Sequence, residues 1–549
     1  MVFVWRFVVE AINFREVSGG HMRITNNMML KTTMSNIYGN KENVNTLNNQ
    51  MSSQKKISRP SEDPVVAIRA LRLRSNLSEI NQYYEKNIPD AEAWLDVTET
   101  SLRNMESILS DIRTQCVYGS TGTLTADDRD AILKSLTQLR EQLYAEGNAD
   151  YAGRTVFTGF RTNCNLTFEQ DEKNTSYDIT QMFSKLDIEK EHRYYKGNAE
   201  VPTDDNITQG DAPGKLERTD CDRIRFAYNS LDVDKDTNEI KNLKLQFTDG
   251  TVENGQLVYN DLNTMTTING DAVTVNTYAT IQEWKDATNF ETGVADNEIV
   301  VIAETGEMLL GTDVTTTIES KDYSLSVSYT KTGFAKGELR PEYYFNCTDT
   351  SPQNEEPIEY KKFDGEGNEL TQDINYVVAQ NQTLTINTNA ADVFNEDAGR
   401  DVDEMMDAVK YAMEAHDKID RIDKMMGLEE YASEEDQAKL QEWKDAAQKE
   451  ADYADDNLKR LFNTYISNFD SYLSDVNLAL TTVGSKGDQL ALTETRMSNQ
   501  QQTITELKSS NEDRELSDII IEYTSAYTAY EASLQAAGKI NQNTLLNYI

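Results

Sequence analysis

Residues 516–549 read LSDIIIEYTSAYTAYEASLQAAGKINQNTLLNYI. Apolar side chains recur there at steps of four and three residues, which places them along one face of a helix: Leu516, Ile520, Tyr523, Tyr527, Tyr530, Leu534 and Ala537. Burying about ten such side chains contributes roughly 15 to 30 kcal/mol, whereas ordering the stretch costs on the order of 30 to 60 kcal/mol. The sequence therefore predicts a helix that needs a partner to be stable.

A second apolar seam lies near the other end of the chain. Its main members recur every seven residues, with two further apolar side chains among them: Leu30, Met34, Ile37, Val44, Leu47 and Met51. The positions between them are mostly Asn, Thr, Ser and Gln, which are poor helix formers. We expect residues 22–58 and 514–549 to form one coiled-coil layer, in a protein that completes its fold by joining others of its kind.

Length and charge limit the class of protein. A chain of 549 residues is expected to hold roughly three to four folding units. The formal net charge of -41 argues against a nucleic-acid partner, because phosphate contacts require a basic surface. No run approaches the roughly twenty apolar residues of a membrane span. Basic residues gather at Arg59, Arg69, Arg72 and Arg74, where a solvated helix face is favoured over a role in stacking subunits.

Residues 1–21 differ from the rest of the chain. The apolar run Val2–Val9 is split by Arg6 and has no small-residue cleavage site after it, so a secretory signal is not expected. Ser18–His21 can be encoded by a purine-rich ribosome-binding sequence. We expect residues 1–21 to be a mis-called extension and Met22 to be the natural start. The four cysteines are scattered without a CxxC pair, which predicts isolated thiols.

Helical patterns fill residues 59–160 and 392–513, which we expect to form a helical layer. Ser61 can cap a helix that starts near Pro64, and Pro89 predicts a kink or a short break. Thr125 begins a capping-box-like start for a helix that ends at Gly147 and pairs antiparallel with the one before it. In the second segment a helix restarts at Ser433, and residues 461–507 form a long helix or a closely broken pair with its weak point at Gly484 and Gly487.

Between these segments the pattern alternates, which predicts a β-rich insert over residues 161–391, built as one or two subdomains. A hairpin turn is expected at 364–368, a strand pair at 374–378 and 384–387, and a short helix at 281–287. The other predicted strands, the first of which closes the helical segment, cover residues 155–160, 224–228, 243–248, 298–303, 323–329 and 342–345.

Several motifs resemble the flagellin superfamily and, within it, the hook-associated proteins of the hook-filament junction. The resemblance covers about residues 22–160 and 374–549. It rests on Arg59-Pro60-Ser61-Glu62-Asp63-Pro64, on Tyr151-Ala152-Gly153-Arg154-Thr155-Val156-Phe157-Thr158-Gly159, on Ile374-Asn375-Tyr376-Val377, on Ile386-Asn387-Thr388 before Asp392-Val393-Phe394, and on Leu545-Leu546-Asn547-Tyr548-Ile549.

The resemblance implies a mainly α fold with a large β-rich insert: a rod with terminal coiled-coil helices, a helical bundle layer and an outer β domain. It also implies a structural adaptor on the filament side of the junction, built as a ring-like layer of self-associated copies. The implied partners are a hook-proximal junction protein, flagellin, and the flagellar export apparatus with a chaperone. The implied location is the extracellular flagellum, reached without a cleaved signal peptide.

Sequence signals of catalysis, cofactors and metal binding are weak. His21, His192 and His416 have no metal-ligand spacing, so solvated or locally paired histidines are favoured. The run Asp232–Asp236 opens like a calcium loop, but Thr237 and Leu243 replace the required Gly and Glu, and a solvated turn is favoured. We expect no enzyme and no cofactor.

The candidate site is an assembly interface. The row of tyrosines at 523, 527 and 530 is interpreted as packing in a helical seam rather than as an aromatic binding strip. Arg59, Glu62 and Asp63 predict either ion pairs between subunits or local capping, with equal weight. Two other functions stay open: flagellin itself, and a surface-binding module whose insert recognises glycan or host protein. The candidate residues are Leu30, Ile37, Val44, Leu47, Met51, Arg59, Glu62, Asp63, Leu516, Ile520, Tyr523, Tyr527, Tyr530 and Leu534.

Overall fold

The structure is a computed structural model that describes residues 26–121, 124–209, 211–287 and 290–542. The predicted extension at 1–21, with its His21, and the motif at 545–549 lie outside the described residues. The chain divides into two compact units. The first unit combines residues 1–84 with 495–549, and the second consists of residues 85–494.

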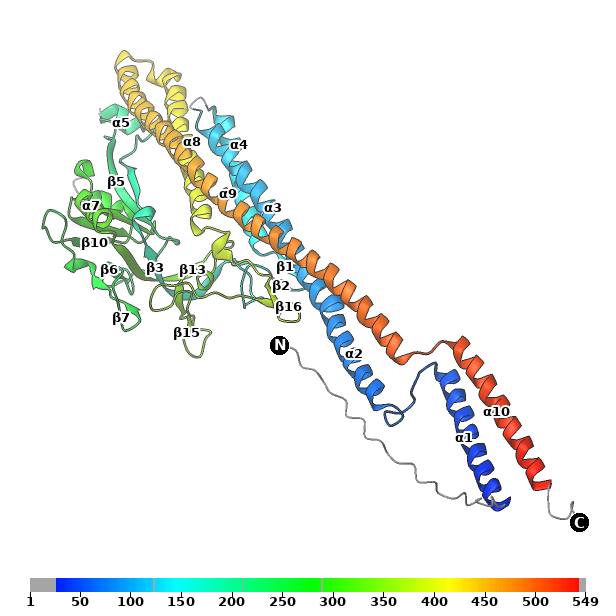
Figure 1. Ribbon diagram of the computed structural model, residues 1–549. Helices are drawn as coiled ribbons and strands as arrows, with labels where there is room; N and C mark the ends of the chain where they lie inside the picture. The colour runs from blue at the N-terminus through cyan, green and yellow to red at the C-terminus, as the bar shows by residue number, and fades with distance from the viewer. Residues whose placement is uncertain (1–25, 122–123, 210, 288–289, 543–549) are drawn as a thin grey trace, which may run out of the picture. The chain divides into compact units, whose positions relative to one another are not determined.

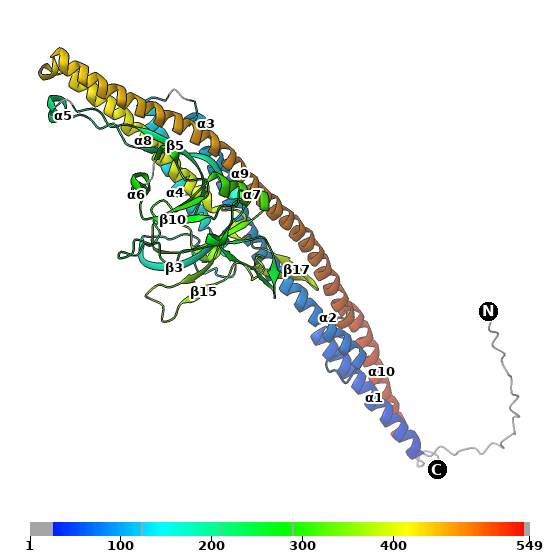
Figure 2. The same cartoon turned by 90° about the vertical axis from the view of Figure 1, so that its left-hand side faces the viewer.

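The first unit contains the paired chain ends. Helices α1 and α10 lie side by side (Figures 1 and 2). Their antiparallel direction follows from the Asn40 amide, which donates to Ser533 Oγ at 3.2 Å, and from the antiparallel bridge between Lys55 and Asp513. The two helices that carry the predicted seams therefore lie against each other. The helices are α1 (Asn26–Ser53), α2 (Pro64–Gln82), the last part of α9 (Glu434–Glu512) and α10 (Leu516–Gln542).

Helix α2 begins at Pro64, as predicted, but its cap is Asp63 rather than Ser61. One Asp63 carboxylate oxygen accepts the backbone N–H groups of Val65 and Val66 at 2.9 and 3.1 Å. Pro64 is tolerated in this first turn because its missing N–H would have no partner within the helix. The break predicted at Pro89 is one turn of π-helix, η1 (Tyr83–Asn87), directly before the helix that carries this proline.

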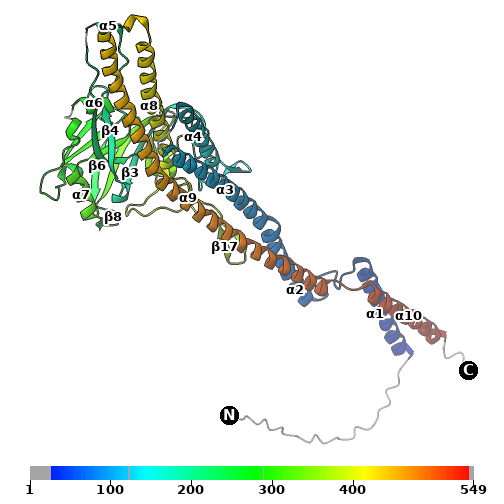
Figure 3. The same cartoon turned by 90° about the horizontal axis from the view of Figure 1, so that it is seen from above.

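The second unit has a helical part in which α8 and α9 form a hairpin. This hairpin lies between the α3–α4 pair and the β-rich insert (Figures 1 and 3). The predicted capping box is present, since Thr125 and Asp128 exchange side-chain and backbone hydrogen bonds. Ile132 and Leu136 are buried and form part of the inner face of α4. The helices here are α3 (Ile88–Gly119), α4 (Ala126–Gly147), α8 (Glu396–Met426) and the first part of α9.

Helix α9 continues through Gly484 and Gly487 without a break, so the structure shows the long helix and not the closely broken pair. A glycine inside a helix costs only about 1 kcal/mol relative to alanine. The neighbouring side chains of Val483 and Leu490 are buried, so packing holds the helix together on both sides of the two glycines. As predicted, the helix starts after Ser433, whose hydroxyl accepts the backbone N–H of Asp436 at 3.0 Å.

The insert contains two sheets, and strands of both alternate along the sequence. The first sheet is antiparallel except for the parallel pair β10–β11, in the order β10 (Thr274–Tyr278), β11 (Glu298–Ile302), β12 (Glu307–Leu310), β5 (Glu217–Arg225), β4 (Glu189–Lys196). The second is antiparallel, in the order β15 (Ile358–Tyr360), β14 (Asn346–Asp349), β3 (Glu172–Phe183), β13 (Ser324–Phe334), β6 (Lys244–Thr248), β9 (Asn260–Asp261).

Smaller elements complete the second unit. Three two-stranded hairpins are β1–β2 (Asp150–Tyr151 and Arg154–Thr155), β7–β8 (Val252–Glu253 and Gln256–Leu257) and β16–β17 (Asn375–Ala379 and Gln382–Thr385). Short helices are α5 (Asp204–Gln209), α6 (Ile281–Ala287) and α7 (Thr312–Lys321). Single 3-10 turns are η2 (Lys185–Asp187), η3 (Leu262–Thr264), η4 (Phe290–Thr292), η5 (Pro341–Tyr343), η6 (Ala390–Asp392) and η7 (Glu429–Tyr431).

Two predicted strands of the second unit are wrong. Residues 156–160 form turns, and Gly159 has a φ of +57°, which extended backbone does not allow. Residues 341–343 form the 3-10 turn η5, since Pro341 presets the helical φ angle at its first position, and the strand begins only at Asn346. The predicted helix at 281–287 and the strand pair around 374–387 are confirmed.

The insert has its own apolar core. Around the first sheet, Trp284, Val300, Ile302 and Leu309 are fully buried. Trp284 packs edge-on against Tyr194, with ring centroids 5.3 Å apart. The structure therefore confirms the predicted fold class, which is mainly helical with a large β-rich insert. The predicted rod shape and the boundaries of the three layers stay predictions.

Candidate assembly surfaces

The α1–α10 pair buries little apolar surface. Its contact face on α10 follows the stripe Ile519, Tyr523, Ala526, Tyr530, which faces Ile37, Val44, Leu47 and Met51 of α1. Of these side chains only Ile37 and Ile519 are buried, with 8% and 0% of their surface exposed. The other apolar side chains are half-buried or exposed. A pair with so small a core has little apolar burial to offset the entropy of ordering two helices.

The seam predicted on α10 is divided between two faces. Tyr523 and Tyr530 are half-buried on the side of α1. Leu516, Ile520, Tyr527 and Leu534, whose spacing of four and seven residues follows one side of a helix, are 43 to 47% exposed. We call these four residues the open stripe. On α1, Leu30 is exposed in the same way, at 37%.

The open stripe borders a shallow groove on α10. Ile520, Ile521, Thr524, Thr528 and Ala532 line this groove. Ile521 is 68% exposed although it is one of the largest apolar side chains of the helix. An apolar face of this kind on a soluble chain is typical of a surface that another protein covers.

Ile519 is the contact residue that sequence reasoning missed. It belongs to a stripe with Tyr523, Ala526, Tyr530 and Ala537, which is as regular as the predicted one. Because α10 carries adjacent apolar residues at 519, 520 and 521, two overlapping seams fit its sequence equally well. Only the position of α1 distinguishes the seam that is filled from the seam that stays open.

An ionic cluster joins the end of α1 to the break between α9 and α10. Arg74 donates two hydrogen bonds, of 2.7 and 2.6 Å, to the carboxylate of Glu512, whose side chain is 5% exposed. Lys55 lies 3.6 Å from Glu512 and pairs with Asp513. The hydrogen bond from Arg74 lowers the pKa of Glu512, and the one from Lys55 lowers that of Asp513. These contacts fix the chain where α1 ends and α10 begins.

The predicted ion-pair residues make local contacts. Asp63 caps α2, and Glu62 Oε2 accepts the backbone N–H of Ser58 at 2.7 Å. Arg59 is exposed, and its carbonyl oxygen accepts the N–H of Glu62. Asp63 and Glu62 thus make local capping contacts. Ion pairs of Arg59, Glu62 and Asp63 between subunits stay a prediction.

The motif at 151–159 ties three elements of the second unit together. Asp90 of α3 accepts hydrogen bonds from Tyr151, at 3.0 Å, and from Tyr376 of β16. Arg154 lies 3.4 Å from the same carboxylate and stacks over the rings of Trp94 and Tyr151. The tight β1–β2 turn requires positive φ at Ala152 and Gly153. The motif thus has a structural role, since it holds the β1–β2 and β16–β17 hairpins against α3.

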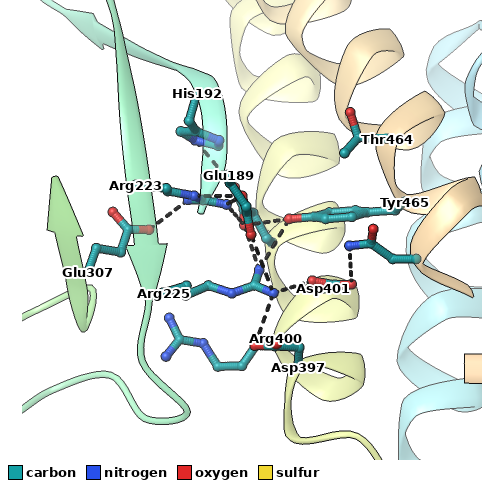
Figure 4. Close-up of polar contacts among 12 residues, drawn as sticks. Glu189, His192, Arg223, Arg225, Glu307, Asp397, Arg400, Asp401, Thr464 and Tyr465 are labelled. Carbon is teal, nitrogen blue, oxygen red and sulfur yellow. Dashed lines mark hydrogen bonds and ion pairs between the residues drawn. The ribbon is translucent and has the colours of Figure 1, made fainter. Parts of the chain in front are cut away.

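A buried ionic network joins the insert to the helices (Figure 4). Arg223 and Arg225 extend from β5, with side chains 1% and 4% exposed. Arg223 donates to Glu189 at 2.9 Å, to Glu307 at 2.8 Å and to Glu404 of α8 at 2.7 Å. Arg225 donates to Glu404 at 3.0 Å and forms an ion pair with Asp401.

Helix α9 completes this network. Its Tyr465 donates to Glu404 Oε2 at 2.6 Å, and Tyr472 and Asn468 donate to Asp401 Oδ2 at 2.9 and 3.1 Å. Although burial opposes ionisation, Arg223 above all keeps the pKa of Glu404 well below its usual range. Burial raises the pKa of Asp401 to about 6 against the attraction of Arg225. The network holds the insert in one orientation on the α8–α9 hairpin.

Residues that suggested metal or acid–base chemistry have structural contacts. Burial lowers the pKa of His192 to about 4, so this ring is neutral at pH 7. His416 lies 2.9 Å from Asp455. Asp234 Oδ1 accepts two backbone N–H groups, which lower its pKa and close the turn that resembled a calcium loop. Within the described parts of the chain, no group of three His, Cys, Asp or Glu side chains could hold a metal ion.

None of the helices that the structure describes is both long and apolar enough to span a membrane. The four cysteines are unpaired in the structure, with Cys116, Cys221 and Cys347 buried and Cys164 half-buried. Burial raises the pKa of Cys116 to about 12, which leaves this thiol unreactive at neutral pH.

Comparison with known proteins gives a family match at the N-terminal end. Residues 24–162 match the bacterial flagellin N-terminal helical region. Flagellar hook-associated protein 3 of Salmonella typhimurium is 32% identical over 142 residues, or 26% of this chain and 44% of that protein. The same-named protein of Escherichia coli K12 is 30% identical over 142 residues, with the same coverage. The chain thus spans less than half the length of these two relatives.

Other comparisons are weaker. A flagellar filament core protein of Treponema maltophilum is 24% identical over 214 residues, or 37% of this chain and 71% of that protein. A solved putative flagellar hook-associated protein from Vibrio parahaemolyticus covers 82% of this chain and 100% of its own, at 13% identity and a TM-score of 0.33. The flagellar junction protein FlgL from Legionella pneumophila covers 78% and 99%, at 11% identity and a TM-score of 0.25. Scores this low carry no argument.

Residues 24–162 are thus similar to the helical N-terminal region of bacterial flagellins. The two relatives at 30% identity or more described above carry the name flagellar hook-associated protein 3. These similarities relate the N-terminal part of the chain to components of the bacterial flagellum.

Proposed function

We propose that this chain is a structural adaptor that joins the hook side of the bacterial flagellum to its filament. The observation that carries the proposal is the open stripe on α10, next to a helix pair in which, among the side chains that the structure describes, only Ile37 and Ile519 are buried. The names of the two hook-associated relatives support the place in the flagellum. The expected partners are further copies of the chain in a ring-like layer, a hook-proximal junction protein and flagellin.

The mechanism of assembly is coupled folding. The α1–α10 pair gains most of its buried surface only when neighbouring subunits cover Leu516, Ile520, Tyr527 and Leu534. Segments that order on binding lose conformational entropy at that step, so the free energy of assembly depends on how completely their apolar faces are covered. Export through the flagellar apparatus with a chaperone, before this folding step, is part of the proposal.

Localisation on the flagellum tests the proposal. An exposed position of the insert, such as Lys235, would be changed to cysteine and labelled with a fluorophore on intact cells. The four natural cysteines include only one that is not buried, Cys164, so a Cys164→Ser background removes most competing label. We expect one focus at the cell-proximal end of each filament. Label along the whole filament would instead identify a filament subunit.

A filament subunit is the second candidate. The observation in its favour is the match to the Treponema maltophilum filament core protein, which covers 71% of that protein, although at 24% identity. The labelling experiment separates the two candidates because filament subunits greatly outnumber junction subunits. A surface-binding role of the insert is compatible with either location.

A further inference from the structure

A cleft between the insert and the helices has no role in the proposed assembly. It has a volume of about 870 Å³ and lies between β4, β5 and α6 of the insert and helix α8. Ligand sites in proteins typically enclose roughly 300 to 1,000 Å³. The cleft adjoins the buried network of Figure 4, from which Arg223, Arg225, Arg400 and Glu404 contribute to its wall.

The carboxylates of this cleft already have partners. Glu404 and Glu307 accept hydrogen bonds from Arg223, and Glu307 also accepts the Tyr194 hydroxyl at 2.9 Å. The remaining three are paired in the same way: Asp403 with Arg140 at 2.7 Å, Asp407 with Lys410 at 2.9 Å, and Glu304 with the backbone N–H of Ile281 at 3.0 Å. Arginine or lysine therefore offsets the charge of four of these five carboxylates, whereas Glu304 contacts a neutral N–H group.

Two buried donors of the cleft have no acceptor, and a third cation donates to neutral oxygens. Within the described residues, Arg225 Nε and Thr305 Oγ1 are buried without a hydrogen-bond partner. Arg400 donates to the carbonyl oxygens of Phe226 and Thr305, both at 2.7 Å. Glu304, Glu307 and Asp286 attract the Lys285 ammonium, but burial outweighs their effect on its pKa. Burial lowers the pKa of both Lys285 and Arg400, and the positive charge of Arg225 contributes to the shift of Arg400.

An excess of unpaired donors around a cavity favours a ligand rich in acceptor oxygens. We propose that this cleft binds a small molecule with an oxyanion group, a carboxylate or a phosphate, held by Lys285 and Arg400. The cleft is larger than an inorganic ion, and tyrosines 194, 195 and 411 line it. A sugar acid therefore fits both its size and its donors. This inference does not depend on the proposed place in the flagellum.

Titration calorimetry on the full chain tests the proposal with three probes: sodium glucuronate, inorganic phosphate and glucose. We expect glucuronate to bind with a Kd on the order of 1 mM, and glucose, which lacks the charge, not to bind. Tighter binding of glucuronate than of phosphate identifies the sugar acid as the source of the oxyanion, and the reverse order identifies phosphate. Absence of binding by both anions at 20-fold above that concentration, about 20 mM, would overturn the proposal.

Two variants locate the site. Lys285→Met removes a positive charge from the cleft and should weaken anion binding about tenfold. Lys235→Met is the matched control, since it removes the same charge from an exposed turn outside the cleft and should leave binding unchanged. Thr305→Val removes only a buried hydroxyl of the cleft. Its affinity for the anion gives a second measurement should Lys285→Met misfold. Equal anion binding by Lys285→Met and Lys235→Met would reduce the effect to general surface charge and contradict the site.

Discussion

Glu404 is the residue on which the buried network depends most. It accepts hydrogen bonds from Arg223, Arg225 and Tyr465. Two arginines in the interior are tolerated only while carboxylates compensate them, because removing one partner leaves an unpaired buried charge. The network therefore fixes the orientation of the insert on the helices but contributes little net stability.

Glu404→Gln should lower the free energy of unfolding of the second unit by about 3 to 5 kcal/mol. Urea unfolding can be followed by the fluorescence of Trp94, Trp284 and Trp443, which lie in this unit. Glu435→Gln is the control, since the Glu435 side chain is 81% exposed and its change should have an effect below about 0.5 kcal/mol. Equal urea midpoints for the two variants would show that the network does not hold the insert.

Glu404 also makes the stability of the buried ionic network depend on pH. The folded pKa of Glu404 is lowered, so its stabilisation is present above the unfolded pKa of about 4.3 and is lost as the pH falls below it.

Glu396 affects stability in the opposite direction, because its pKa in the folded state is raised. Burial, with a contribution from Asp397, raises its pKa to about 7, so the native state binds a proton that the unfolded chain releases between about pH 4 and 7.

Glu396→Gln should therefore flatten the decline in stability between pH 4.5 and 7. In the wild type, the Glu396 contribution to stability falls by about 2 to 3 kcal/mol as the pH rises through this range. Gln cannot ionise, so this contribution disappears in the variant. Urea midpoints at three pH values measure it. A wild-type slope that persists in Glu396→Gln would contradict the assignment to this carboxylate.

At the scale of single elements, α10 has two apolar faces and only one of them is covered by α1. The predicted seam mixes residues of both faces, since Tyr523 and Tyr530 point toward α1 while Tyr527 belongs to the open stripe. The open stripe is the face that assembly must cover. A change there should act on association and not on the fold of the free chain.

Tyr527→Asp should reduce incorporation into flagella by at least about 100-fold, because burying an unpaired carboxylate at an interface costs several kcal/mol. Tyr527→Phe is the matched control and should assemble, since it keeps the ring and loses only the hydroxyl. Circular dichroism of the purified variants should match the wild type. Normal assembly of Tyr527→Asp would contradict the assignment of the open stripe.

Most helices could be predicted from the sequence because their signals are local. The starts at Pro64 and after Thr125 depend on capping residues within a few positions of each other. The strands were harder, because pairing joins residues far apart: β3 pairs with β13, which follows it by over 140 residues. No local pattern marks β3 or β4 clearly, and Pro341 converts a strand-like stretch into a 3-10 turn.

The candidate site was predicted only in part, for a different reason. Periodicity shows that a helix has an apolar face, but it does not show which neighbour covers that face. Ile519 was missed on these grounds. The ionic network was also missed: Arg223 and Arg225 come close to α8 only through the folded topology, and their sequence spacing of two residues is typical of any strand.

For the whole molecule, the two compact units have different roles in the proposal. The second unit, with its apolar core and ionic network, can fold within one chain. The first unit exposes apolar residues on α1, α2 and α10, among them Val65, Ile68 and Leu71 at 54 to 68%. A net charge of -41 keeps free copies apart in solution. Association must therefore come from specific apolar faces and not from general attraction between chains.

Amide hydrogen exchange can show whether the two terminal helices become ordered only when subunits assemble. The measurement compares a verified monomer with the same protein incorporated into flagella, over residues 26–53 and 516–542. We expect fast exchange in both segments of the monomer, slow exchange in the core of the second unit, and strong protection of the two terminal segments after assembly. Full protection of both segments in the monomer would contradict the account.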